Sequence, residues 1–67
     1  MFHIQLDKED DGRWLAEVAE IPGAMAYGNS RQEAYASAAA LALRVVAERI
    51  EHGEPVPAEA RELFAAA

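Results

Sequence analysis

Hydrophobic and polar residues alternate along two short segments near the start of the chain. Phe2 to Asp7 follows a period of two, and Arg13 to Val18 follows it again. Such alternation is typical of a β-strand that buries one face. Between the segments stands Asp11-Gly12, a pair that tolerates the positive φ angles of hairpin turns. The pattern predicts an antiparallel hairpin in which Trp14 is largely buried between the sheet and a helix.

A turn is expected where the alternation breaks, at Ile21-Pro22-Gly23. Proline removes a backbone donor, and glycine permits unusual φ angles. The next segment, Ala24 to Gly28, suits a third short strand. We expect Gly23 and Gly28 to shape the backbone rather than to bind a ligand. A positive φ at either glycine would make its replacement by valine destabilising.

A long helix is predicted from Arg31 to about His52, because this stretch is rich in alanine and contains no glycine or proline. Ser30 and Glu33 form a capping-box pattern at its start, and Gly53 is typical of the residue just past a helix end. At about 1.5 Å per residue the helix is roughly 33 Å long, whereas strands of about five or six residues span roughly 20 Å. The helix must therefore cross the sheet diagonally or extend beyond it.

The predicted helix carries two apolar stripes. The first stripe consists of Tyr35, Ala39, Ala42, Leu43, Val46 and Ile50. The second stripe consists of Ala34, Ala38, Leu41 and Val45. One stripe can cover the sheet, and the other would face water if the helix packs on one side only. We expect Leu41 and Val45 to lie in a subunit interface; the alternative is that the small alanines of their stripe need no partner.

A similar surplus of apolar residues is expected on the sheet. Leu15, with whichever of Met25 and Tyr27 shares its side, would lie opposite the face that carries Trp14. Exposed apolar patches of this kind mark partner sites. A 67-residue chain without cysteine has no disulfides, and chains of this size usually need a further source of stability such as oligomerisation. We therefore predict at least a dimer, and the candidate residues for its interface or for a partner's are Leu15, Met25, Tyr27, Leu41 and Val45.

These elements predict an α+β fold, in which a three-stranded antiparallel sheet packs against one long helix. Residues 1–57 form the domain, and residues 58–67 form a C-terminal tail. The segment from Glu54 to Pro57 could be a linker or a fourth short strand at the sheet edge. A further short helix is predicted in the tail, from Ala58 to Phe64.

The charge of the chain restricts its partners. Twelve acidic residues against six basic ones give a net charge of −6. Phosphate backbones and anionic membranes both call for clustered Lys and Arg, so neither is an expected partner. No apolar run reaches the roughly 18 residues that would span a bilayer. We expect a cytoplasmic protein that binds basic partners, without direct contact to nucleic acid or membrane.

No residues in the sequence match a catalytic or metal-binding pattern. The acids among Asp7 to Asp11 lack the ligand register of a calcium loop, which ends on a bidentate glutamate. His3 and His52 are far apart in sequence and stand in no metal-ligand spacing. Ser30 is already used as a helix cap, and no glycine-rich phosphate loop is present. The prediction is that the protein is not an enzyme and has no catalytic, metal or cofactor site.

Four segments, in order, resemble the HicB-type antitoxin domain. Asp11 to Val18 is similar to the second strand of that family, and Glu20 to Ser30 is similar to its proline-glycine turn and third strand. Gln32-Glu33-Ala34 resembles the opening of the family's helix, and His52 to Pro57 resembles the segment that follows the helix. The resemblance covers residues 2 to 57. Among the differences, alanine replaces a cysteine that many members carry in the third-strand segment.

The resemblance implies a partial RNase H-like arrangement, β-β-β-α-β in order, without the carboxylates of a nuclease. It implies an antitoxin-like module that sequesters and neutralises a small basic HicA-type toxin, which cleaves mRNA. Members that regulate their own genes carry an additional DNA-binding domain, which we do not expect within these 67 residues. One alternative is an orphan oligomeric domain of this fold with a regulatory or scaffolding role and no cognate toxin. Another is a metal-dependent nuclease, for which Asp7 and Glu17 would need further acids on later elements.

Overall fold

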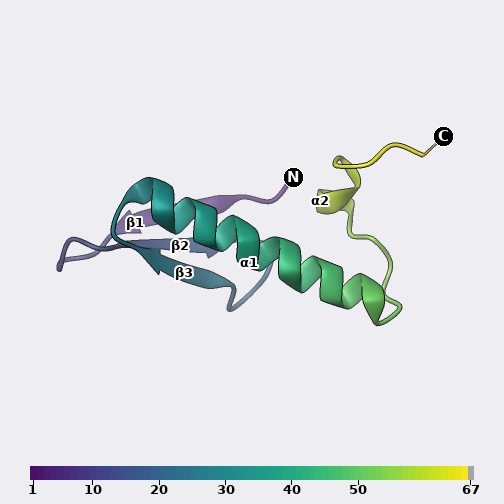
Figure 1. Ribbon diagram of the computed structural model, residues 1–67, viewed down its shortest axis with the longest axis horizontal. Helices are drawn as coiled ribbons and strands as arrows, with labels where there is room; N and C mark the ends of the chain where they lie inside the picture. Colours follow the sequence, from purple (N-terminus) through teal and green to yellow (C-terminus); the bar gives the residue numbers. More distant parts are fainter. Residues whose placement is uncertain (67) are drawn as a thin grey trace.

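Three antiparallel strands and one long helix make up most of the protein, of which the computed structural model describes residues 1–66. The elements, in chain order, are β1 (Ile4–Lys8), β2 (Trp14–Val18), β3 (Met25–Gly28), α1 (Arg31–Glu51) and α2 (Ala58–Arg61). The strands form one sheet in the order β1-β2-β3, and α1 packs against it (Figure 1). The predicted α+β fold is confirmed. Within residues 1–66 the sheet has no fourth strand, because the segment 54–57 forms none.

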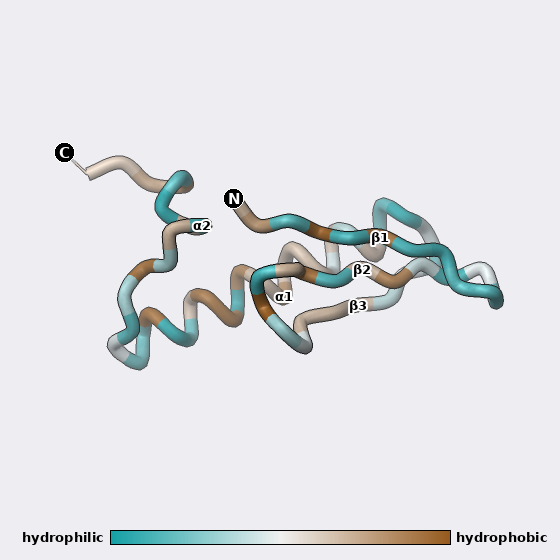
Figure 2. The backbone as a smooth tube through the Cα atoms, turned by 180° about the vertical axis from the view of Figure 1, so that it is seen from behind, coloured by the Kyte–Doolittle hydropathy of each residue, from teal (hydrophilic) through white to brown (hydrophobic). Residues whose placement is uncertain are grey.

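The turn between β1 and β2 is closed by its backbone and by one carboxylate. The Glu9 amide donates to the Arg13 carbonyl over 2.7 Å, and Gly12 has a φ of 90°. The Asp11 carboxylate accepts the backbone N–H of Arg13 at 3.0 Å and its side-chain Nε at 2.8 Å. This turn is one of the most hydrophilic parts of the chain (Figure 2). It projects from the end of the sheet, as the Asp-Gly pattern predicted.

The two faces of β2 are also as predicted. Ala16 and Val18 are buried on the face that α1 covers. Trp14 shares this face and packs against the core, but it is half-buried, which is less than the sequence suggested. Its register partner on β3 is Gly28, which has no side chain to cover the indole.

Two glycines shape the connection from β2 to α1 for different reasons. Gly23 has a φ of 86°, in a turn where the Ala24 amide donates to the Ile21 carbonyl over 3.0 Å. Gly28 does not have a positive φ. A Cβ on Gly28 would instead lie 2.4 Å from the backbone nitrogen of Ala34, in the first turn of α1. Gly23 is therefore needed for its φ, and Gly28 for the close approach of the helix.

Both ends of α1 carry the predicted caps. The Ser30 hydroxyl accepts the backbone N–H of Glu33 over 3.1 Å, which satisfies one of the free donors of the first turn. At the other end Gly53 has a φ of 90°, and the amides of Gly53 and Glu54 donate to the carbonyls of Ile50 and Arg49, each over 3.0 Å. This pair of bonds is the Schellman motif. The helix therefore ends where the glycine pattern predicted.

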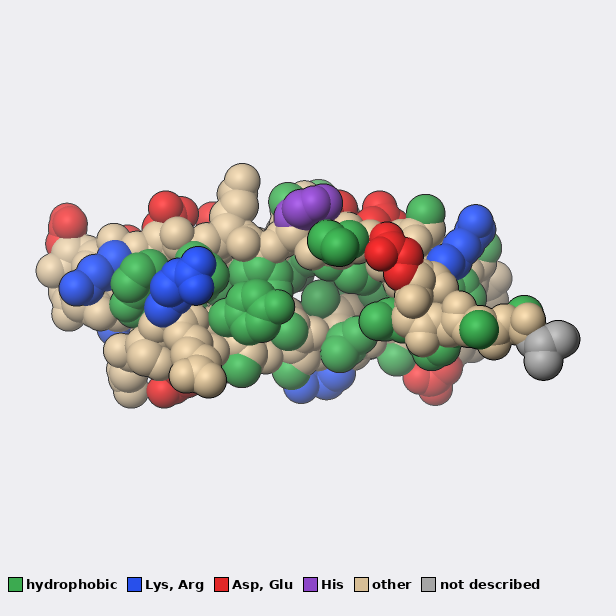
Figure 3. Space-filling view, turned by 90° about the horizontal axis from the view of Figure 1, so that it is seen from above, with side chains coloured by type: hydrophobic (Ala, Val, Ile, Leu, Met, Phe, Trp, Pro, Cys, Tyr) green, Lys and Arg blue, Asp and Glu red, His purple; other side chains and the backbone are tan. Residues whose placement is uncertain are grey.

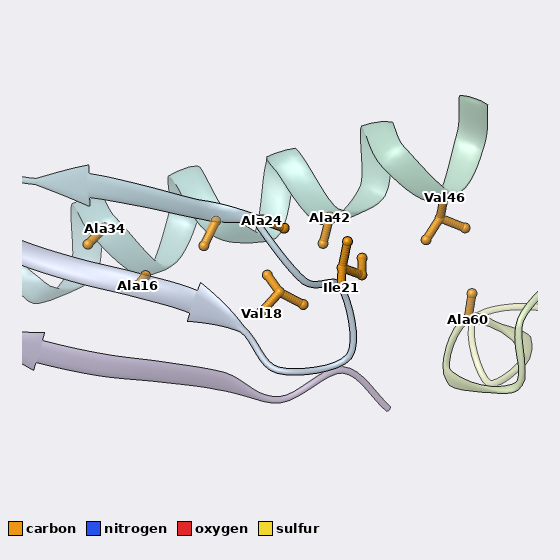
Figure 4. Packing of buried hydrophobic residues seen from close by; sticks show 9 residues of the cluster. Ala16, Val18, Ile21, Ala24, Ala34, Ala42, Val46 and Ala60 are labelled. Carbon is orange, nitrogen blue, oxygen red and sulfur yellow. The ribbon is translucent and has the colours of Figure 1, made fainter. Parts of the chain in front are cut away.

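The core consists mostly of small side chains. Its buried residues are Ala16, Val18, Ile21, Ala24, Ala34, Ala38, Ala42, Val46 and Ala60 (Figure 4). Alanines along α1 let the helix lie close to the sheet, and Leu41 and Val45 are half-buried beside them, packed against the core. Tyr35 and Leu43, from the first stripe, are each 52% exposed. The core-facing side of α1 is made of members of both stripes, Ala34 and Ala38 from the second and Ala42 and Val46 from the first. The exposed Tyr35 and Leu43 belong to the first stripe, whereas Leu41 and Val45 are half-buried.

The C-terminal half of α1 extends beyond the sheet, and the molecule is accordingly elongated, 46 × 22 × 14 Å (Figure 1). Beyond the sheet, α1 packs against α2 instead. Its Ala60 is only 1% exposed and faces Val46 of α1 (Figure 4). The N-terminal ammonium of Met1 donates to Glu62 Oε1 over 2.7 Å. The segment after α1 is therefore folded back along the helix, and of the predicted tail only Ala67 lies outside the described residues.

Candidate interaction surfaces

Three of the candidate residues meet on the side of the sheet that α1 leaves uncovered. Leu15 on β2 is in register with Tyr27 on β3, and Met25 shares the same side through its register with Glu17. Tyr27 is 48% exposed, Met25 is 44% exposed, and Leu15 is half-buried between them and β1. We call the surface formed by Leu15, Met25 and Tyr27 the outer sheet face. Both Met25 and Tyr27, not one of them, share the side of Leu15.

Charged groups border the outer sheet face. The guanidinium of Arg13 lies 4.5 Å from the ring centroid of Tyr27, within the range of a cation–π contact. Asp11 holds this guanidinium in place through its bond to Nε. The backbone N–H of Arg13, followed by its side chain, lowers the pKa of Asp11 below the ordinary value, because both donors favour the charged carboxylate. The arrangement fixes one cation at the edge of an apolar surface whose other neighbours, Asp7 and Glu17, are acids.

A second carboxylate fixes the start of β1. Glu20 accepts the backbone N–H of His3 at 2.8 Å and lies 2.5 Å from its ring Nδ1. The backbone bond, followed by the ring bond, lowers the pKa of Glu20 below its ordinary value. The pair ties residues before β1 to the turn after β2. The sequence showed only that His3 stands in no metal-ligand spacing, and it did not indicate this contact.

Leu41 and Val45 do not join the outer sheet face. They lie on α1, on the opposite side of the sheet, and pack against the core. The five candidate residues therefore form two groups, separated by the thickness of the sheet.

An apolar groove that the sequence did not predict lies between α1, the start of the chain and α2. Its volume is about 410 Å³. We call it the β1 groove, and its lining includes Phe2, Ile4, Tyr35, Ala39, Leu43 and Leu63, with Glu59 and Glu62. Hydrophobic side chains gather around a hollow in the middle of the face seen in Figure 3. The helical pattern did indicate a surplus of apolar residues, but it could not say that residues of both stripes would be buried and that Tyr35 and Leu43 would stay exposed.

The described residues bring together no group that suggests a metal or a buried charge. Within residues 1–66, no three His, Asp or Glu side chains are placed to hold a metal ion. In the same range no polar or charged residue is buried. No helix among the described residues is both long enough and apolar enough to cross a membrane.

Comparison of the chain with models of known protein families, with curated proteins and with solved structures gives no match. The segments that resemble the HicB-type domain have clear structural roles in this fold. Gly12 and Gly23 supply positive φ angles, Ser30 caps α1, and Gly53 ends it. These residues are therefore accounted for by the fold of this chain, whatever its surface binds.

Proposed function

We propose that this chain is an antitoxin-like binding module that sequesters and neutralises a small, basic, HicA-type mRNA-cleaving toxin. The observation that supports it best is the outer sheet face: exposed Met25 and Tyr27 with half-buried Leu15, on a chain of net charge −6. Buried apolar area supplies most of the affinity in such an interface, and complementary charge raises the rate of encounter and the specificity. Neutralisation would be steric, by covering the toxin's active site.

The proposal assigns no catalytic step, cofactor or metal to this chain, and no direct contact with nucleic acid. We propose a cytoplasmic location, which suits both an mRNA-cleaving partner and a chain without cysteine.

The test is inhibition of RNA cleavage by the purified chain. The probe is a basic HicA-type protein encoded next to the gene of this chain, assayed on a labelled mRNA. We expect cleavage to stop at a stoichiometric ratio of the two proteins. Replacing Leu15 and Tyr27 by lysine should abolish the inhibition, whereas Gln32→Lys, an exposed control on α1, should leave it intact. Full cleavage in the presence of excess wild-type chain rejects the proposal.

The alternative is an orphan oligomeric domain with a regulatory or scaffolding role. Two separate apolar surfaces on so small a chain, the outer sheet face and the β1 groove, favour self-association as well as partner binding. Self-association without any toxin gene nearby would favour this alternative. A neighbouring basic reading frame whose product the chain inhibits would favour the first.

A further inference from the structure

The free edge of β1 exposes an uninterrupted row of backbone donors and acceptors. In an antiparallel pair, residues alternate between those bonded to the neighbour and those whose N–H and C=O point away. The Ala19 amide donates to His3 and the Glu9 amide donates to Arg13, at 2.9 and 2.7 Å. Odd-numbered residues of β1 therefore face β2. The N–H and C=O groups of Ile4, Leu6 and Lys8 point outward, where the strand order places no neighbour within the described residues.

This edge lacks most of the features that protect natural edge strands from pairing. Such edges are usually short, or carry proline, bulges or several charges. Phe2 to Lys8 contains no proline or glycine, and its register with β2 is continuous from Ile4 to Lys8. The edge on β3 is one residue shorter and follows directly from a Pro-Gly turn. β1 is therefore the better site for an added strand.

The helix side of β1 is also incompletely covered. Phe2, Ile4 and Leu6 point to this side and are only half-buried. Two of them, Phe2 and Ile4, line the β1 groove opposite exposed Tyr35 and Leu43. A strand added to β1 would place alternate side chains over this groove. One added strand could therefore satisfy both features. Its backbone would bond to the free edge, and apolar residues on its helix side would fill the groove.

We infer that the occupant is a second copy of this chain, whose β1 pairs antiparallel with β1 about a two-fold axis. The two sheets would join into one continuous sheet, with both copies of α1 on the same side. This inference deepens the proposed self-association and rests on it, but it does not require a toxin. Residues contacting the partner would be those of β1 rather than the outer sheet face.

Several registers are geometrically allowed, and the one centred on Gln5 pairs the most residues because Gln5 lies midway between Phe2 and Lys8. Outward-pointing residues must pair with outward-pointing residues, so the axis passes through a residue of β1. With the axis at Gln5, Ile4 lies opposite the partner's Leu6, Asp7 opposite the partner's His3, and Phe2 opposite the partner's Lys8. An axis at Asp7 would oppose two carboxylates, which is destabilising. The axis at Gln5 pairs every residue from Phe2 to Lys8 without such a clash.

Local charge favours a second copy over a basic partner at this edge. The segment from Phe2 to Lys8 carries one acid and one base, although the whole chain carries −6. A basic protein would find no excess negative charge along the strand. Two copies repel one another only through the distant charges, which salt screens. Added salt should therefore strengthen the self-association, whereas it should weaken binding to a basic toxin.

The experiment is disulfide trapping, which the absence of native cysteine makes unambiguous. Gln5→Cys would lie opposite itself across the axis, at a Cα separation of about 4.5 Å for such a pair, which a disulfide can bridge. Asp7→Cys lies opposite His3, and Met25→Cys lies at the other edge of the same side. We expect Gln5→Cys to form cross-linked dimers much faster than either control variant under mild oxidation.

A second measurement does not depend on oxidation. Sedimentation equilibrium of the wild-type chain should give twice the 7.3 kDa of one chain, and Gln5→Lys should shift the mass toward 7.3 kDa by placing two cations in contact. The matched control, Gln32→Lys, should remain dimeric. A wild-type monomer rejects both the interface and the proposed self-association. A wild-type dimer in which Gln5→Cys cross-links no faster than Met25→Cys rejects only the β1 interface.

Discussion

At the scale of single residues, the position of the backbone restricts which residue can stand at a site. Gly28 illustrates this best, because the constraint on it comes from α1 and not from its own φ. The sequence indicated that Gly28 is structural, but its reason could not be predicted. The distance between the end of β3 and the first turn of α1 exists only in the folded chain.

Replacing Gly28 with alanine should reduce the free energy of unfolding by more than ~1 kcal/mol, since the new Cβ meets backbone atoms that cannot move aside. Urea denaturation followed by Trp14 fluorescence measures the change. Gly12→Ala is the comparison: its Cβ meets open space, so its cost comes from the positive φ alone. Equal stability of Gly28→Ala and the wild type would show that the helix is not held this close to β3.

The Glu20 carboxylate gives a prediction for pH. Its pKa is lower in the folded chain than the ordinary 4.5, so the contact with His3 stabilises the fold fully above that value. As the pH falls below it, the unfolded chain binds the proton first, and this contribution is lost. Denaturation curves measured between neutral pH and pH 3 should therefore show a decrease in stability that Glu20→Gln reduces. An unchanged pH profile in Glu20→Gln would contradict this role.

At the scale of elements, the sequence predicted each strand and both ends of α1, but not the side on which α1 packs. Alternation and caps are local signals, and the residues that carry them, such as Ser30 and Gly53, act within a few positions. The face that α1 buries is not a local property. It runs between the two stripes and takes Ala34 and Ala38 from one and Ala42 and Val46 from the other, because alanines allow the closest approach of helix and sheet. For the same reason the β1 groove and the folded-back α2 could not be predicted.

Substitutions on the two stripes should separate their roles. Leu41→Glu should reduce the free energy of unfolding by about 1 kcal/mol or more beyond the effect of Leu43→Glu, because Leu41 packs on the core and Leu43 is half exposed. Chemical denaturation of each variant measures the difference. A larger loss from Leu43→Glu would mean that Leu43, and not Leu41, is the residue packed against the core.

The packing of α2 can be tested separately. Ala60→Glu places a charge at a position that is 1% exposed, so α2 should detach from α1 while the sheet stays folded. Limited proteolysis between Glu54 and Phe64 should then become faster. The exposed neighbour variant Ala58→Glu serves as the control. Unchanged proteolysis of Ala60→Glu would show that α2 contributes little to the fold.

At the scale of the whole molecule, shape and charge together determine which surfaces partners can occupy. An elongated chain of net charge −6 presents its apolar surfaces on opposite sides of one thin sheet. The outer sheet face and the β1 edge can therefore be occupied at the same time, by different partners. A dimer joined through β1 would present two outer sheet faces on one side.

If the outer sheet face binds a basic toxin, charged residues should affect the association rate and apolar residues the dissociation rate. Raising the salt concentration should slow association, because the long-range attraction is screened. Leu15→Ala and Tyr27→Ala should instead speed dissociation, because they remove apolar contact. Stopped-flow measurements resolve both rates. Salt-independent association would argue against charge complementarity as the source of encounter.

The composition of the core has a calorimetric consequence. Among residues 1–66, six of the nine buried hydrophobic residues are alanines, and no large side chain is fully buried. The heat capacity of unfolding grows with the apolar area that unfolding exposes, so it should be small for one isolated chain. Its thermal transition should be broad, with a shallow dependence of stability on temperature. A melting curve that sharpens as the protein is concentrated would then measure the additional surface that each chain buries against another.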